Sequence, residues 1–339
     1  MSRLFKSLML TVKSLILTAA LSAALPAFAL NILVTNDDGW NTENIKALKI
    51  ALVNAGHHVI LSTPCGNQSG KGGSISFLKA VRVDNSRSSD NEFCIGDVDA
   101  NLSFAKYVEG TPLMSALYGI DVAAKDTWGS APDLVISGPN EGNNLGYLNN
   151  SSGTLGAAMI SAVRGIPAIA VSAYSSDATN AVLVSKVVVD LVKQLEATRQ
   201  TGRPLLPAFT GLNVNTPKDM VNNRGYKFTD IGWNGGGADI KFSKSLADDP
   251  VAAGYLSQGI VAALGIDSAT AAGIVKQKYT GAMGISFDTG GALVADTNEM
   301  SEGVALQAGY ITISTFDAQI QASQAKAAVT RLKLQSLLK

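Results

Sequence analysis

The chain has little charge for its length. Only 16% of its 339 residues are charged, and 27 basic side chains balance 27 acidic ones. Without a basic excess, nothing draws the protein electrostatically to nucleic acid or to an acidic membrane face. The hydrophobic fraction of 46% is that of a globular protein with one large domain, or with a domain and an appendage. We therefore expect no nucleic-acid binding.

Histidine is scarcer still. His57 and His58 are the only two, and they open a predicted strand at the end opposite the polar loops described below. A histidine nucleophile or general acid is therefore not expected among those loops. Any chemistry there must depend on carboxylates, hydroxyl groups and a metal ion.

The first 29 residues have the pattern of a secretory signal peptide. Three basic residues lie within the first 13 positions, Ser14–Leu25 is apolar, and Ala27 and Ala29 form an Ala-x-Ala cleavage site. An uncleaved membrane anchor is the alternative, but the apolar run is short for a spanning helix and Pro26 interrupts it. No cysteine follows the run, so a lipid anchor is not indicated. We expect a secreted or periplasmic protein with no membrane anchor after cleavage.

Short apolar runs alternate with amphipathic segments through residues 30–215. Ile32–Val34 has the length of a buried strand, apolar residues recur at helical spacing over 45–52, and His57–Ser62 forms the next strand. A strand, helix, strand order with short connections predicts parallel strands and right-handed crossovers. We therefore predict an α/β fold, a Rossmann-like three-layer sandwich with a mostly parallel sheet. Further strands are expected at 133–137, 167–172 and 209–214, and helices at 112–121, 154–164 and 178–197.

Residues 216–339 are less regular. Short strands near 226–233 and at 310–313, an alanine-rich helical stretch over 251–278 and an amphipathic helix over 318–338 predict a β-rich C-terminal extension with a helical insert. The predicted organisation is thus a signal peptide at 1–29, an α/β core at 30–215 and the extension at 216–339.

Asp37 and Asp38 are adjacent carboxylates at the carboxyl end of the first predicted strand. Asn36–Gly39 ends that strand abruptly, and Thr42 can cap the helix that follows. In an open α/β sheet, ligands bind outside the carboxyl ends of the strands. Two neighbouring negative charges repel unless a cation lies beside them, which favours a hard divalent metal. A solvated Asx turn is the alternative interpretation.

A second loop follows the next parallel strand and must share the same edge of the sheet. Gly66–Ser76 is rich in glycine, but Cys65 and Gly72 stand where a P-loop requires a glycine and a hydroxyl residue, so a Walker motif is not expected. Backbone N–H groups of such a loop can still close on an anion. A flexible loop without a ligand is the alternative.

A third loop, Ser137–Thr154, mixes glycines with Asn140, Asn143 and Asn144. Asparagine carbonyls ligate hard cations and asparagine amides donate to phosphate oxygens, so this composition suits a site that holds both. Ser152–Thr154 then begins a helix, where free N–H groups and the dipole favour an anion. A capped loop of turn-forming residues is the alternative.

Short motifs along residues 31–175 match a known family in type and order. They are Ile32–Gly39, Ser69 with Gly70, Gly110–Pro112, and the set Ser137, Gly138, Asn140, Gly142, Asn144 and Gly146. A weaker likeness occurs at 296–297 and 309–313. The pattern resembles the stationary-phase survival protein SurE family, which comprises metal-dependent nucleotidases and acid phosphatases.

The resemblance implies a divalent cation, Mg²⁺ or Mn²⁺, with Asp37 and Asp38 at the catalytic centre. Whether Asp37 acts as base, nucleophile or ligand alone stays open. The implied metal ligands are Asp37, Asp38, Ser69 and Asn140, and the residues implied around the phosphate are Asn36, Gly70, Asn144, Ser152, Gly153 and Thr154.

The leading hypothesis is a phosphomonoesterase that acts on nucleoside monophosphates. The rival is a periplasmic binding protein that captures a phosphorylated or anionic ligand without turnover. The carboxylate pair favours the enzyme, because a pure anion receptor gains nothing from negative charge beside its ligand. The resemblance and the amphipathic C-terminal helix also predict a homo-oligomer, a dimer or a tetramer.

Cys65 and Cys94 are the only cysteines. An even pair in an exported chain predicts a disulfide, and two buried free thiols are the alternative. A bridge would tether the second loop close to Ser69 and Gly70.

Overall fold

The computed structural model describes residues 29–96, 110–237, 239–288 and 294–337. Residues 1–28 of the expected signal peptide lie outside these ranges. Within the described ranges, no helix has both the length and the apolar character that a membrane crossing requires.

One large sheet organises the described part of the chain. Its nine strands there follow the order β3-β4-β2-β1-β5-β6-β7-β11-β8. Neighbours from β4 to β7 are parallel, whereas β3 and β11 run antiparallel to β4 and β7. The strands are β1 (Asn31–Thr35), β2 (His58–Pro64), β3 (Val83–Asp84), β4 (Glu92–Ile95), β5 (Leu134–Glu141), β6 (Ala168–Ala173), β7 (Thr210–Asn215), β8 (Tyr226–Thr229) and β11 (Ile311–Asp317). The prediction of a mostly parallel sheet is confirmed.

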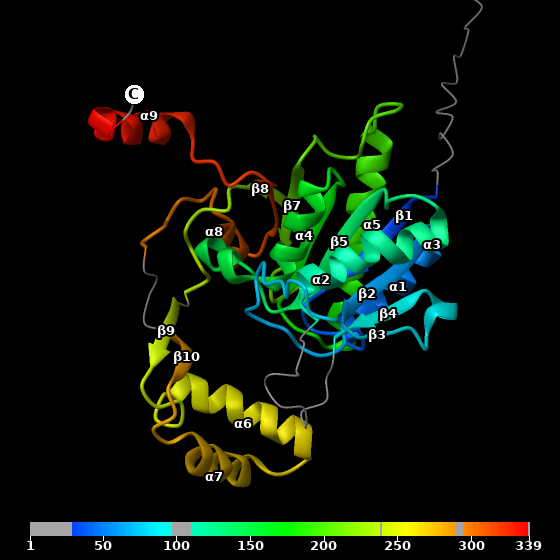
Figure 1. Cartoon of the computed structure of the whole chain (residues 1–339). Coiled ribbons are helices and arrows are strands. Elements are labelled where there is room, and N and C mark those ends of the chain that lie inside the picture. The colour runs from blue at the N-terminus through cyan, green and yellow to red at the C-terminus, as the bar shows by residue number, and fades with distance from the viewer. Residues whose placement is uncertain (1–28, 97–109, 238, 289–293, 338–339) are drawn as a thin grey trace, which may run out of the picture.

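Helices cover both faces of this sheet, as Figure 1 shows. Successive residues of a strand point to opposite faces, so Ile32 and Val34 pack in one core cluster and Leu33 in the other. The first cluster includes residues of α1 (Glu43–Asn54) and α5 (Ala178–Thr198), and the second includes residues of α3 (Ala124–Trp128) and α4 (Gly153–Val163), with α2 (Pro112–Tyr118) packed against α4. The predicted three-layer sandwich is therefore confirmed.

The C-terminal region both completes the sheet and carries an insert. Strands β8 and β11 extend the central sheet beyond β7. Between them, β9 (Asp239–Ser243) and β10 (Gly284–Asp288) form a separate antiparallel pair, with α6 (Pro250–Leu264) and α7 (Ser268–Tyr279) in between. Figure 1 shows this hairpin and its two helices away from the main sheet, and α9 (Gln324–Lys333) extending on its own near the C-terminus. The expected helical insert is present.

Several element boundaries differ from the sequence expectations. Strand β5 continues to Glu141 because Asn140 still pairs with Ser172 of β6 across a bulge. The helical stretch over 251–278 is two helices, because Gly265 ends α6 in the left-handed conformation and Asp267 caps α7. The helix expected over 112–121 continues through a π-helical turn to residue 128. The helix expected over 318–338 covers only 324–333, with a 3₁₀ turn at Gln335–Leu337, and the residues between β11 and α9 have no regular structure.

Candidate active site

The loops after β1 and β5 meet at the carboxyl edge of the sheet through Asp37. Its Oδ1 accepts a hydrogen bond of 2.7 Å from Thr154 Oγ1 in the first turn of α4. Asn144 Nδ2 donates to the same hydroxyl at 3.4 Å. A Cβ atom on Gly153 would lie 2.7 Å from Asp37 Cβ, so glycine allows the helix to approach this closely. One hydroxyl therefore joins a candidate metal ligand to a candidate phosphate-binding residue.

The glycine-rich loop after β2 closes on the same turn. The Gln68 N–H donates to the backbone carbonyl of Asp37 at 2.7 Å. Asn67 then links two of the predicted ligands, because its Nδ2 donates to Asp38 Oδ1 at 3.4 Å and its Oδ1 accepts from the Ser69 N–H at 3.0 Å. The three loops predicted to share one edge of the sheet do converge.

Both carboxylates are removed from solvent. Asp37 is 3% exposed and Asp38 is 9% exposed. Burial raises the pKa of Asp37, and the hydrogen bond from Thr154 offsets part of that rise. Burial first, and then the charge of Asp37, raise the pKa of Asp38 to about 8, although the Glu141 N–H donates to its Oδ2 at 2.9 Å. A cation between the two groups would relieve the cost of burying adjacent negative charges.

Some predicted residues use their side chains to shape the loops. Asn36 closes its turn by accepting from the Gly39 N–H at 3.2 Å and donating to the Gly39 carbonyl at 2.8 Å. Ser152 caps α4 by accepting from a backbone N–H of its first turn. Asn140 Nδ2 donates to the Gly142 carbonyl at 2.5 Å, a bond that does not use its Oδ1. Asn36 and Ser152 thus set the shape of the carboxylate turn and the start of α4, whereas the Asn140 oxygen lies outside the bond that its side chain makes.

The residues present fit a hard divalent metal. Within the described ranges, no group of three or more histidine, cysteine or acidic side chains could hold a metal ion. Two buried carboxylates would therefore need hydroxyl and amide oxygens to complete the ligand set, and these are available from Ser69 on the glycine-rich loop and from Asn140 near the end of β5. An all-oxygen set suits Mg²⁺ or Mn²⁺ better than Zn²⁺. Ser69 and Gly70 lie on the exposed side of the site.

A layer of buried polar residues supports the third loop and was not foreseen from the sequence. Asn144 Nδ2 donates to Ser172 Oγ at 2.8 Å, and its backbone carbonyl accepts from Asn215 at 2.9 Å and Asn213 at 3.2 Å. Glu302 contacts the same layer from the C-terminal region. Asn213 and Asn215 alternate near the end of a strand with apolar neighbours, and this was the signal available in the sequence.

A disulfide joins Cys65 and Cys94, as predicted. Their Cα atoms lie 4.7 Å apart, and the bridge ties the start of the glycine-rich loop to β4. Because Asn67 and Gln68 contact the carboxylate turn, this bridge restrains one wall of the site.

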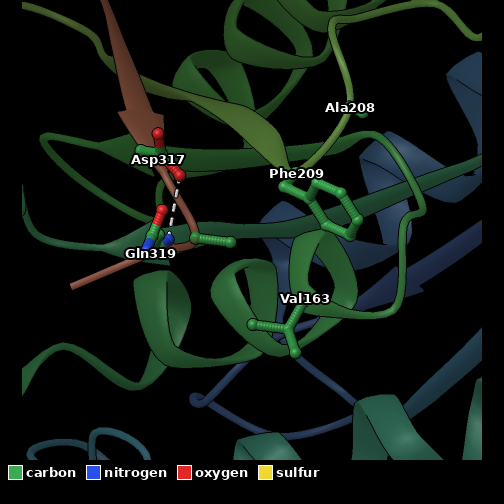
Figure 2. Close-up of a pocket in the computed structure, with 6 residues that line it drawn as sticks. Val163, Ala208, Phe209, Asp317 and Gln319 are labelled. Atoms are coloured by element: carbon green, nitrogen blue, oxygen red, sulfur yellow. Dashed lines mark hydrogen bonds between the residues drawn. The ribbon is translucent and has the colours of Figure 1, made fainter. Parts of the chain in front are cut away.

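One cavity of the described chain lies away from these polar groups. It has a volume of about 380 Å³ and is lined by Val163, Ala208, Phe209 and residues 317–319. Figure 2 shows these residues where α4 ends and β7 begins, at the amino edge of the sheet. Open α/β sheets bind their ligands at the carboxyl edge, so we place the functional site there.

The fold and site together define a class of protein: a Rossmann-like α/β protein whose carboxyl edge brings two buried carboxylates together with hydroxyl and amide groups at the N-terminus of a helix. Comparison with known proteins narrows the class. The family model for survival protein SurE matches residues 32–236. The chain belongs to the SurE family.

Individual relatives agree with this assignment. The chain is 34% identical over 202 residues to the protein named 5'-nucleotidase SurE of Thermosipho africanus, covering 59% of this chain and 70% of that protein. It is 35% identical over 206 residues to an acid phosphatase of Yarrowia lipolytica, covering 55% of this chain and 56% of that one. The crystal structure of the SurE protein from Aquifex aeolicus superposes with a TM-score of 0.62 at 25% identity, covering 89% of this chain and 99% of that one.

Proposed function

We propose that this chain is a metal-dependent phosphomonoesterase that hydrolyses nucleoside monophosphates to nucleoside and phosphate. Family membership, with relatives named 5'-nucleotidase and acid phosphatase, makes it a phosphoric monoester hydrolase. The observation that carries the finer proposal is the Thr154 hydroxyl. It donates to Asp37 from the first turn of α4, so a proposed cation ligand lies beside the N–H groups that would bind the phosphate.

The proposed site residues fall into cation ligands and phosphate donors. Asp37, Asp38, Ser69 and Asn140 would hold the cation. Bound Mg²⁺ or Mn²⁺ would neutralise phosphoryl charge and lower the pKa of an attacking water. The first N–H groups of α4 have no intrahelical acceptor, so Gly153 and Thr154 offer donors and a positive dipole end to the phosphate.

The side chains of the site are held in place by hydrogen bonds before a substrate binds. Thr154 can give only one proton, which Asp37 accepts, so the hydroxyl orients that carboxylate while it also fixes the Asn144 amide. Donors that are already in place need not reorganise as charge develops on the phosphoryl oxygens.

Phosphate release is the test. Metal-stripped protein would be given a panel of 5'- and 3'-nucleoside monophosphates and an aryl phosphate, with Mg²⁺, Mn²⁺ or no metal. We expect hydrolysis only with metal added and faster turnover of nucleotides than of the aryl ester. Nucleotide binding without release at any pH between about 5 and 9 would favour the ligand-binding protein instead.

We also propose that the protein is exported. The disulfide supports this location, because such bridges persist in oxidising compartments. Cell fractionation with N-terminal sequencing should find the protein outside the cytoplasm with Leu30 as its first residue. A cytoplasmic protein that retains residues 1–29 would contradict the proposal.

We further propose a homo-oligomer, a dimer or a tetramer, assembled through the C-terminal region. Large apolar side chains are exposed on the β9–β10 hairpin and on α9, among them Phe242, Ile285, Val329 and Leu332. Such unpaired apolar surface favours association. Light scattering at micromolar concentration should give a multiple of the chain mass, and removal of residues after 322 should lower it; a monomeric full chain would contradict the proposal.

A further inference from the structure

Glu302 is a buried carboxylate that the proposed chemistry does not use. It is the first residue of α8 (Glu302–Gln307), and its exposure is 0%. One oxygen, Oε1, accepts from the Gly146 N–H and from Asn149 Nδ2, each at 2.9 Å. The other, Oε2, accepts from Asn213 Nδ2 at 2.9 Å and from Ser314 Oγ at 3.0 Å. One carboxylate thus joins the third loop to strands β7 and β11.

Two hydrogen-bond partners of Glu302 lie on the third loop, close to the proposed phosphate site. Gly146 and Asn149 belong to the short 3₁₀ segment Gly146–Ser151. This segment joins Asn144, which donates to the Thr154 hydroxyl, at one end to the N-terminus of α4, the proposed phosphate donor, at the other. A shift of the segment relative to the sheet would therefore move the N-terminus of α4 and strain the bond between Asn144 and Thr154.

Close packing also holds the C-terminal region against the 3₁₀ segment. A Cβ atom on Gly146 would lie 2.7 Å from the Asn234 carbonyl oxygen, and one on Gly303 would lie 2.5 Å from it. Tyr147 on the 3₁₀ segment also donates a short hydrogen bond to Asp239 at the start of β9. The chain beyond residue 230 therefore packs directly on the loop.

We propose that Glu302 is a positioning residue, which holds the 3₁₀ segment against the sheet so that the N-terminus of α4 faces the phosphate group while Asn144 keeps its bond to Thr154. This proposal rests on the proposed function. It makes the C-terminal region a structural part of the active site, although it provides none of the proposed metal ligands.

Asp249 offers a matched control. It is also a buried carboxylate of the C-terminal region, 7% exposed, and accepts from backbone N–H groups of α6 and from Ser286 Oγ. These partners and Lys241 all lie within the β9–β10 insert. Asp249→Asn should therefore lower stability without disturbing the loop.

Two substitutions at Glu302 separate positioning from folding. Glu302→Ala removes every acceptor and leaves buried donors unpaired. Glu302→Gln keeps one acceptor oxygen for Gly146 and Asn149. Its new amide would face Asn213, whose buried Oδ1 has no partner and can accept after the Asn213 amide turns. The glutamine variant should therefore fold even if the alanine variant does not.

The experiment compares wild type, both Glu302 variants and Asp249→Asn. The measurements are the inhibition constant of inorganic phosphate, kcat, KM, Mn²⁺ affinity by calorimetry, and the phosphate-induced shift in melting temperature. We expect Glu302→Ala to weaken phosphate inhibition about tenfold, or about 1.4 kcal/mol, and Glu302→Gln about threefold. Mn²⁺ affinity should stay within about twofold, because the proposed metal ligands lie on other segments. A factor of two corresponds to only about 0.4 kcal/mol.

The outcomes are distinct. Unchanged phosphate inhibition in the folded Glu302 variants, or an equal loss in Asp249→Asn, would overturn the positioning role. Wild-type protein that releases no phosphate with any metal would instead overturn the proposed function. The phosphate-induced shift in melting temperature needs no turnover and would still report on the loop in that case.

Discussion

The central sheet holds its carboxylates differently at the carboxyl ends of its parallel strands, the carboxyl edge, and at their amino ends, the amino edge. At the carboxyl edge, Asp37, Thr154 and Glu302 are nearly or fully buried and bonded to one another or to neighbouring loops. At the amino edge, Asp133 is exposed and accepts from the Asn31 N–H. His57 there accepts from the Leu30 N–H, a structural contact.

Burial of the carboxylates distinguishes the candidate site from the exposed surface. Burial of carboxylates costs stability, which is why the pKa of Asp38 rises to about 8 and that of Glu302 to about 7. Such a cost persists in a fold when the groups serve another purpose, here the proposed binding of a cation and a phosphate. At the amino edge burial also lowers the pKa of His57, but among the described residues no two adjacent carboxylates are buried there, although a cavity lies close by.

The largest expected effect follows from the same substitution made at each edge. Asp37→Asn removes a ligand charge but keeps the shape and can still accept from Thr154, so metal-dependent hydrolysis should fall at least about a thousandfold with the fold intact. Asp133→Asn should leave kcat/KM within about twofold. Steady-state kinetics and circular dichroism measure both. Asp37→Asn with activity within about tenfold of wild type would contradict the metal assignment.

The disulfide gives the next largest effect, on stability. Cys65 and Cys94 are 29 positions apart, and the chain-entropy estimate for a loop of this size is about 3.5 kcal/mol. Loss of the bridge also frees the loop that contacts Asp37 and Asp38, so metal affinity should weaken together with stability.

Chemical denaturation and Mn²⁺ titration of the Cys65→Ser/Cys94→Ser double variant, with and without reductant, measure this effect. Reductant should lower the stability of wild type and leave the double variant unchanged. Two reactive thiols per chain in denatured, non-reduced wild type would show that the bridge does not form in solution.

The carboxyl edge was partly foreseeable from the sequence. Parallel strands place their following loops together, and this rule alone brings Asp37 close to Thr154, 117 positions away. The rule depends on apolar runs that the sequence shows plainly.

The supporting layer was not foreseeable by the same means. Asn213 and Asn215 alternate with apolar residues, a pattern that normally marks a solvent-facing side of a strand. Glu302 lies in a six-residue helix, and its partner Asn149 is 153 positions away. Pairing over that distance depends on the path of the insert, which no local pattern encodes.

Glu302 should also leave a smaller, pH-dependent signature. Burial raises its pKa from 4.5 to about 7, although its hydrogen bonds oppose the rise. Between these pH values the folded chain keeps a proton that the unfolded chain has released, so this group's contribution to stability falls as pH rises. Glu302→Gln cannot titrate, so its stability should decline less than that of wild type between about pH 5 and 7.5.

Urea denaturation of metal-free wild type and variant at several pH values measures the difference, and both proteins keep Asp37 and Asp38. Asp249→Asn is the control, because hydrogen bonds hold the pKa of Asp249 at about 2, outside this window. Parallel stability curves for wild type and Glu302→Gln would contradict the raised pKa.

The smallest effect is expected at the amino-edge cavity. Phe209 lines it with a φ of +62° and is 55% exposed. Glycine adopts positive φ without strain, a gain of about 1 kcal/mol that offsets the roughly 1 kcal/mol of apolar burial lost with a half-exposed ring. Phe209→Gly should therefore change stability little, whereas Phe209→Ala loses the ring without relieving the backbone and should be less stable by about 1 kcal/mol. Both should keep kcat/KM within about twofold, since the cavity lies at the edge opposite Asp37. Kinetics and denaturation of the two variants check this. A tenfold loss of activity in either variant would show that part of the active site lies at the amino edge and would contradict its placement at the carboxyl edge.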